Sequence, residues 1–112
     1  MRLLVMFDLP VVSAKDRKVA SSFRHYLLND GYHMLQYSVY VRICSGWEMV
    51  DTHINRLQNH IPKKGSVRVF KITERQFENM MILAGHKILE IDKNYNKDKV
   101  IIIPNFSNLD KY

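Results

Sequence analysis

The chain has 112 residues, of which 46% are hydrophobic and 25% charged, as in an ordinary folded domain with a single core. No apolar run reaches the roughly 18 residues of a membrane span, and strand-like sequence follows Met1 directly, so we expect neither a membrane anchor nor a signal peptide. Cys44 is the only cysteine, which excludes an internal disulfide and favours a cytoplasmic protein. The net charge of +6 favours a polyanionic partner, most often nucleic acid, over a basic protein that is merely soluble.

The first stretch, Arg2–Pro10, places one acidic residue at the end of a strongly apolar segment. Residues 3–7 are all apolar, and Asp8 follows them. An unbroken run of this kind is typical of a strand buried on both faces, and Leu9-Pro10 ends it because proline cannot donate to a sheet ladder. Asp8 is therefore a candidate site residue, and a turn-forming aspartate at a strand exit is the alternative interpretation.

A helix is predicted from Ser13 to Asn29, because Ser13 is a suitable N-cap, Asp16 follows it at capping-box spacing, and Gly31 supplies a stop. Helical spacing places an apolar set on the side expected to face the core: Val19, Phe23, Tyr26 and Leu27. The other side carries Arg17, Lys18, Arg24 and His25.

Residues 32–43 are rich in tyrosine, valine and isoleucine and predict strand structure. The sequence leaves open whether Tyr32–Gln36 and Val39–Ile43 are two strands around a tight turn or one bent strand. A second helix is predicted over Glu48–Ile61, and Pro62-Lys63-Lys64-Gly65 forms a turn.

The remaining elements are a strand over residues 66–73, a helical turn over 73–77, a short strand over 79–84 and a final apolar strand over 100–103. With right-handed crossovers, this order predicts an α+β, ferredoxin-like βαββαβ sandwich with extra C-terminal strands. We expect residues 1–84 to form that domain. Residues 85–112 are expected to be a linker plus a C-terminal strand that pairs with the sheet edge of a partner protomer, which would make a homodimer.

Four motifs in order resemble those of Cas2, the small CRISPR-associated adaptation protein. They are the strand ending in Phe7-Asp8, the helix opening with Asp16-Arg17, the segment of residues 31–40 with its Gln-x-Ser-Val-aromatic pattern, and the Thr-Glu-x-Gln-Phe turn at residues 73–77. The Pro-Lys-Lys-Gly turn and the Phe-Asp-Leu-Pro form are similar to the type II branch of that family.

The resemblance implies a homodimer that bridges dimers of the CRISPR integrase, Cas1, and binds duplex DNA during acquisition of new spacers. It also implies an alternative, a metal-dependent endonuclease acting on RNA or DNA, in which Asp8 from each protomer holds Mg²⁺ and is catalytic. The chain departs from family members regarded as nucleases at Leu9-Pro10 and Met34, which removes candidate ligands and a phosphate contact. We therefore expect the main role to be non-catalytic.

Several basic residues are candidates for contacts to duplex phosphates without base readout, and a solvated face is the alternative for each one: Arg17, Lys18, Arg24, Lys63 and Lys64. The five histidines, among them His53 and His60, show no tight metal-ligand spacing and are expected on the surface. An RNA-recognition module on the same topology is disfavoured, because residues 39–42 lack the glycines of its base-stacking strand.

Overall fold

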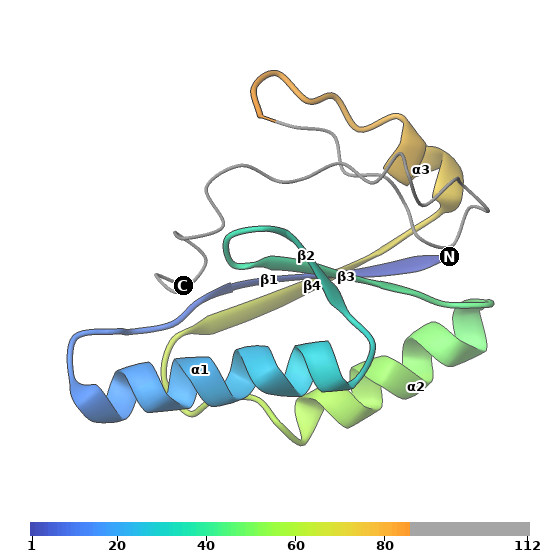
Figure 1. Cartoon of the computed structure of the whole chain (residues 1–112). Helices are drawn as coiled ribbons and strands as arrows, with labels where there is room; N and C mark the ends of the chain where they lie inside the picture. The colour runs from blue at the N-terminus through green and yellow to red at the C-terminus, as the bar shows by residue number, and fades with distance from the viewer. Residues whose placement is uncertain (86–112) are drawn as a thin grey trace.

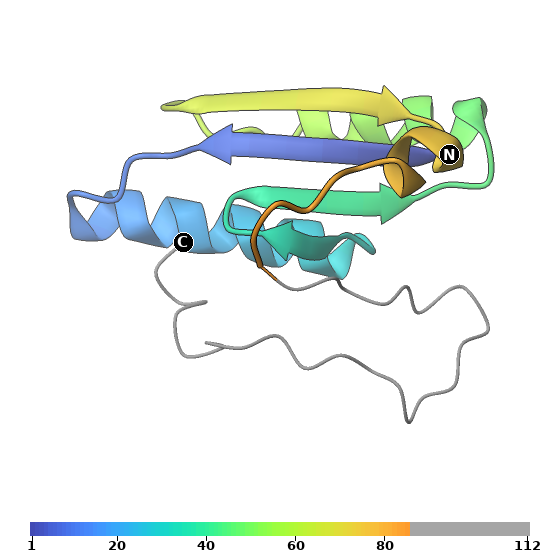
Figure 2. The same cartoon turned by 90° about the horizontal axis from the view of Figure 1, so that it is seen from above.

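The computed structural model describes residues 1–85, so the predicted linker, the strand over 100–103 and His86 lie outside the described residues. The element order is β1 (Arg2–Asp8), α1 (Ala14–Asn29), β2 (His33–Gln36), β3 (Val39–Ile43), α2 (Trp47–Gln58), β4 (Ser66–Ile72) and α3 (Glu74–Glu78). The strands form an antiparallel four-stranded sheet in the order β2-β3-β1-β4. Helices α1 and α2 cover one face, and α3 lies on the other side near the start of β1 (Figure 1, Figure 2). The ferredoxin-like βαββαβ fold predicted from the sequence is therefore confirmed.

The core lies between the sheet and the two long helices. Leu3, Val5 and Phe7 alternate along β1 and are buried on the helix side. The Phe7 ring meets the Phe23 ring edge-on at 5.1 Å and stacks on Tyr40 at 5.7 Å. Since Phe7 immediately precedes Asp8, this aromatic cluster fixes the end of β1 on which the candidate site residue lies.

The apolar run of β1 had predicted a strand buried on both faces, but only one face of β1 is fully buried. Leu4 and Met6 alternate with the core residues and are only half-buried, on the face that α1 and α2 leave open. The two long helices cover only one face, and α3 covers the other face only near Arg2; this explains the difference, because the second face of an antiparallel sheet does not need a full protein cover within the same domain.

Residues 32–43 form two strands, which decides the alternative that the sequence left open. Strands β2 and β3 pair around a turn in which Ser38 takes a positive φ of 63°, and a register shift lies between Met34 and Gln36. Helix α2 ends at Gln58 rather than Ile61, and Asn59 is its C-cap.

Two further predictions were wrong. Residues 79–84 form no strand and pair with no described strand. Helix α3 has Asn79 as its C-cap, and the apolar side chains of residues 80–83 are exposed. Val19 is 41% exposed rather than part of the core, because the buried stripe of α1 runs through Ala20, Phe23 and Leu27.

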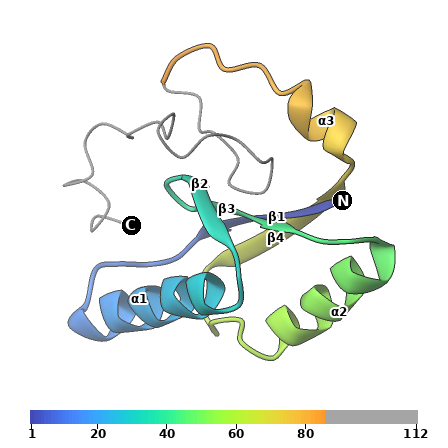
Figure 3. The same ribbon diagram turned by 45° about the vertical axis from the view of Figure 1, so that its right-hand side comes forward.

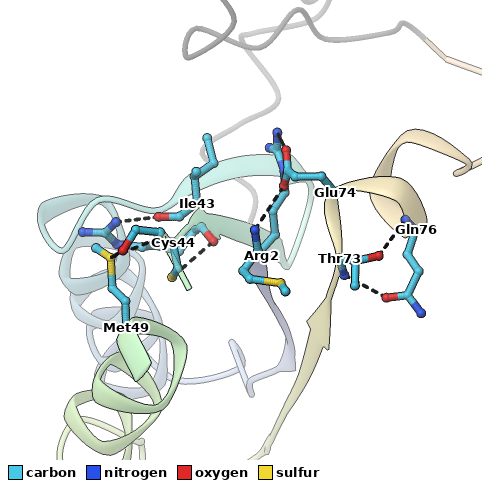
Figure 4. A network of polar contacts seen from close by, with 10 residues as sticks. Arg2, Ile43, Cys44, Met49, Thr73, Glu74 and Gln76 are labelled. Atoms are coloured by element: carbon cyan, nitrogen blue, oxygen red, sulfur yellow. Dashed lines mark hydrogen bonds and ion pairs between the residues drawn. The ribbon is translucent and has the colours of Figure 1, made fainter. Parts of the chain in front are cut away.

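Helix α3 gives the Thr-Glu-Arg-Gln-Phe segment a structural role. Thr73 and Gln76 form a capping box, with Gln76 N donating to Thr73 Oγ1 at 3.1 Å and Thr73 N donating to Gln76 Oε1 at 2.8 Å. Glu74 accepts two hydrogen bonds from the buried Arg2 guanidinium, from Nε at 2.7 Å and from Nη2 at 2.8 Å (Figure 4). The Phe77 ring centroid lies 4.1 Å from Arg2 Cζ. The motif therefore fastens α3 to the first strand.

Candidate functional site

Asp8 is the last residue of β1, and its backbone is positioned by the neighbouring residues Gly65 and Ser66. It pairs in register with Ser66, the first residue of β4, and its side chain is exposed. Gly65 takes a positive φ of 92°, and a Cβ at this position would lie 2.5 Å from the Asp8 carbonyl oxygen. Only glycine therefore lets the turn before β4 approach Asp8 this closely.

Strand alternation places the Asp8 side chain on the open face of the sheet. Arg2, Leu4 and Met6 precede it at two-residue steps, and Arg2 contacts α3 on that same face. The carboxylate therefore points away from α1 and α2 and shares its face with half-buried apolar side chains.

Residues 1–85 of one chain do not supply a full set of Mg²⁺ ligands. Among residues 1–85, no group of three or more histidine, cysteine, aspartate or glutamate side chains is close enough to hold a metal ion. Asp8 offers one carboxylate, and Leu9 and Pro10 add no side-chain oxygen. Because Mg²⁺ is usually held by one or two carboxylates together with waters and substrate phosphates, Asp8 alone is half of a plausible protein site.

Two of the basic candidates, Arg17 and Lys64, contact the loop that leaves β1 and the start of α1. Arg17 Nη1 donates to the carbonyl oxygens of Val11 at 3.3 Å and Val12 at 2.9 Å. Lys64 Nζ lies 3.9 Å from Asp16 Oδ1. These contacts are exposed and contribute little to stability, but they bring cationic groups from two segments to one end of the molecule.

The five predicted DNA-contacting residues do not form one continuous patch. Lys18 and Lys63 are exposed near the start of α1 and in the turn before β4, together with Arg17 and Lys64. Arg24 lies about two helical turns further along α1. It is half-buried near Tyr40, whose pKa is raised by burial, and the positive charge of Arg24 opposes that rise.

His53 is buried, which corrects the expectation that every histidine lies on the surface. It is 3% exposed, and its Nδ1 lies 3.0 Å from Oδ2 of the buried Asp30. Arg56 forms an ion pair with the other carboxylate oxygen, and Arg42 Nε donates to the Asp30 backbone carbonyl at 3.0 Å. These four residues, the Asp30 cluster, thus connect the C-terminal end of α1 to α2 and β3.

The sequence carried a signal for this burial. His53 follows Val50 by three residues and precedes Leu57 by four, so it lies on the buried stripe of α2. Next to it, burial raises the pKa of the Tyr32 phenol well above its usual range, and the Asp30 carboxylate adds to this rise. Cys44 is also buried, and burial raises the pKa of its thiol, which keeps it protonated at neutral pH.

These features define a class: small ferredoxin-like α+β domains in which an exposed carboxylate ends the first strand beside a basic surface on the first helix. Within that class the chain belongs to the Cas2 family, because residues 1–80 match the family model described as CRISPR associated protein Cas2. The motif resemblance seen in the sequence is thereby confirmed, whereas membership of the type II branch stays a prediction.

Relatives match over most of the chain. A CRISPR-associated endoribonuclease Cas2 of Acidovorax ebreus is 46% identical over 102 residues, which cover 91% of this chain and 99% of that protein. A protein of the same name from Flavobacterium psychrophilum is 44% identical over 91 residues, covering 81% of this chain and 79% of the relative. The crystal structure of Streptococcus pyogenes Cas2 at pH 6.5 is 24% identical and matches with a TM-score of 0.57, covering 75% of this chain and 100% of that one. This last likeness supports the fold alone. Within residues 1–85, no helix combines the length and the apolar character that crossing a membrane requires.

Proposed function

We propose that this chain is a non-catalytic CRISPR adaptation factor: a homodimeric bridge that holds duplex DNA between dimers of the CRISPR integrase, Cas1, while new spacers are acquired. The observation that carries the proposal is the contrast between a set of basic side chains and a single acidic candidate. Arg17, Lys18, Lys63 and Lys64 gather at the start of α1 and in the adjacent turn, whereas Asp8 is a single carboxylate. Such a surface suits phosphate contacts better than hydrolysis.

The open face of the sheet supports the dimer. Phe70 pairs in register with Leu4 on that face and is 58% exposed, and Met6 lies next along β1. Strand β4 is an edge strand of seven residues. An apolar face beside a strand edge that no strand within residues 1–85 covers favours a second copy, both by face packing and by strand addition from the C-terminal segment.

A second candidate, a metal-dependent endonuclease, is favoured by the position of Asp8 and by the endoribonuclease names of the relatives. A dimer that closes the open face would bring the two Asp8 carboxylates to one interface, where together they would suit one Mg²⁺ ion. When bound, such an ion activates water and phosphate oxygens for hydrolysis. This chain's own residues would then only position the ion and the phosphate.

The substitution Asp8→Asn separates the two functions. Asparagine keeps the shape of the side chain and discards the charge that a metal needs, so we expect normal folding, integrase binding and spacer acquisition, together with loss of any Mg²⁺-dependent cleavage. Acquisition is measured in cells, and cleavage is measured on purified protein with Mg²⁺ and with a chelator. Asp51→Asn is the matched control, because Asp51 is an exposed aspartate on α2 that pairs with Lys71 at 2.9 Å. Lost acquisition in an Asp8→Asn protein that still folds and binds the integrase would favour the enzyme.

A further inference from the structure

A groove with an apolar floor lies between α1 and the segment that follows α2. That segment passes beside α1 on its way to β4 (Figure 1, Figure 3). The groove has a volume of about 480 Å³, within the range of sites that accept a small group or a few side chains. Its floor is formed by Val19, Phe23, Tyr26 and Pro62, and its rim by Lys15, Lys18, Ser22 and His60.

The walls of the groove are held by contacts inside the chain. The Tyr26 ring stacks on the His60 ring, with centroids 3.9 Å apart and planes 15° from parallel. His60 Nδ1 lies 2.9 Å from the Arg56 carbonyl oxygen, and the Phe23 ring is packed against Phe7 in the core. The groove is therefore preformed and does not need to open before binding.

The floor exposes apolar surface that no other described element covers. Val19 is 41% exposed in the groove, and Ile61, in the segment that borders it, is 45% exposed. Fully burying an occupant's own apolar side chain of valine size contributes about 1.5 kcal/mol, which is a little more than a tenfold gain in affinity. A bound group that supplies an apolar side chain would gain this energy, whereas a bare phosphodiester backbone would not.

The rim selects the sign of the occupant's charge. Lys15 and Lys18 border the groove, and Lys63 and Lys64 follow Pro62 at one end of it. Asp16 is the one acidic group paired with these lysines in residues 1–85, 3.9 Å from Lys64. The rim is therefore net positive, and acidic side chains would complement it.

We infer that this groove is a docking site for an acidic peptide segment of a protein partner, one that inserts a bulky apolar side chain between flanking carboxylates. The inference adds a protein-binding function beside the proposed DNA contacts. It favours a peptide over duplex DNA, because a phosphodiester backbone would use the cationic rim but leave the apolar floor exposed.

Two labelled designed helical peptides test the inference by fluorescence anisotropy with the full chain. Both carry the same leucine stripe, flanked by glutamates in one and by lysines in the other. The glutamate peptide is expected to bind and the lysine peptide to fail. Val19→Gln should weaken the glutamate peptide about tenfold, because it removes the apolar contact without changing the charge. The double variant Lys15→Gln with Lys18→Gln should weaken it as well and reduce its salt dependence.

Leu28→Gln is the matched control, since Leu28 is a 49% exposed apolar residue of α1 outside the groove. It should bind the glutamate peptide like the parent chain. Duplex DNA affinity is also measured on Val19→Gln and Leu28→Gln, which do not alter the charge, and neither substitution should change it. Failure of the groove and failure of the DNA-bridging role are therefore distinguishable. Equal binding of both peptides, no binding of the glutamate peptide, or an equal loss in Val19→Gln and Leu28→Gln would each overturn the inference. A drop in duplex affinity confined to Val19→Gln would assign the groove to nucleic acid instead.

Discussion

Gly65 packs against the backbone of Asp8 so closely that a Cβ at Gly65 would lie 2.5 Å from the Asp8 carbonyl oxygen and 2.9 Å from Leu9 Cδ2. The turn before β4 and the end of β1 therefore position each other. Since Asp8 is the candidate metal ligand and Lys63 and Lys64 belong to the same turn, this close approach sets the spacing between the acidic and the basic parts of the site.

Gly65→Ser should lower the free energy of unfolding by about 2 kcal/mol, because it combines a steric clash with a left-handed backbone that L side chains rarely adopt. The backbone amide signals of residues 8–10 should shift in NMR spectra. Gly46→Ser is the control: Gly46 has a φ of −173°, open space around its Cβ position and the N-cap position of α2, where serine is preferred. Equal urea midpoints for the two variants would contradict the proposed role of Gly65.

The order of elements could be predicted from the sequence because local signals and the global fold agree. Ser13 and Asp16 form the capping box that their spacing had suggested, and Thr73 and Gln76 form a second one. The apolar run of residues 3–7 correctly indicated a central strand. Its one-sided burial could not be seen, since apolar residues on the open face of a strand look the same in sequence as those that face the core.

The site could be predicted in part. The position of Asp8 at the end of β1 followed from Leu9-Pro10. The close approach of Gly65 to Asp8 could not be predicted, because the sequence does not show which part of the backbone a turn glycine contacts. The burial of His53 was missed because the histidines were judged by metal-ligand spacing rather than by helical phase. Val19 was assigned to the core because a helical stripe locates a buried face only to within about one residue's rotation, or 100°.

The Tyr32 hydroxyl provides a pH-dependent test of the packing. It is buried with no hydrogen-bond partner among residues 1–85, and burial raises its pKa above the ordinary value of 10.0. A folded-state pKa above the unfolded value contributes stability that is fully present below about pH 10 and is lost as the pH rises through the folded pKa. Tyr32→Phe removes that titration.

We expect Tyr32→Phe to be as stable as the parent chain at pH 7 or more stable by up to about 1 kcal/mol, since it removes an unpaired buried polar group. Between about pH 10 and 11.5 the parent should lose more stability than the variant, as measured by urea unfolding at each pH. Parallel losses would show that other groups, such as Tyr26, whose pKa is also raised by burial, control the alkaline limit.

The proposed dimer predicts that an open-face substitution weakens self-association. Phe70→Gln should shift the protein toward monomer in light scattering, because it removes a large exposed ring opposite Leu4. Val12→Gln is the control, since Val12 is 88% exposed in the loop before α1 and lies off the sheet. A chain ending at Asp98 should also lose dimer stability if the C-terminal strand adds to the partner's sheet. A monomeric full-length protein would rule out the bridge.

Duplex DNA binding should be electrostatic and tolerant of sequence. Replacing Arg17, Lys18 and Arg24 together with alanine should weaken binding to unrelated duplexes by similar factors. The slope of log affinity against log salt should fall by about 0.9 for each phosphate that the variant no longer neutralises. Lys71→Ala is the control for a removed positive charge, because Lys71 pairs with Asp51. Since Arg24 is half-buried and lies about two turns from Arg17, restoring it alone should recover less affinity than restoring Arg17 and Lys18. An unchanged salt slope in the triple variant, or a strong preference for one sequence, would count against phosphate bridging by this helix.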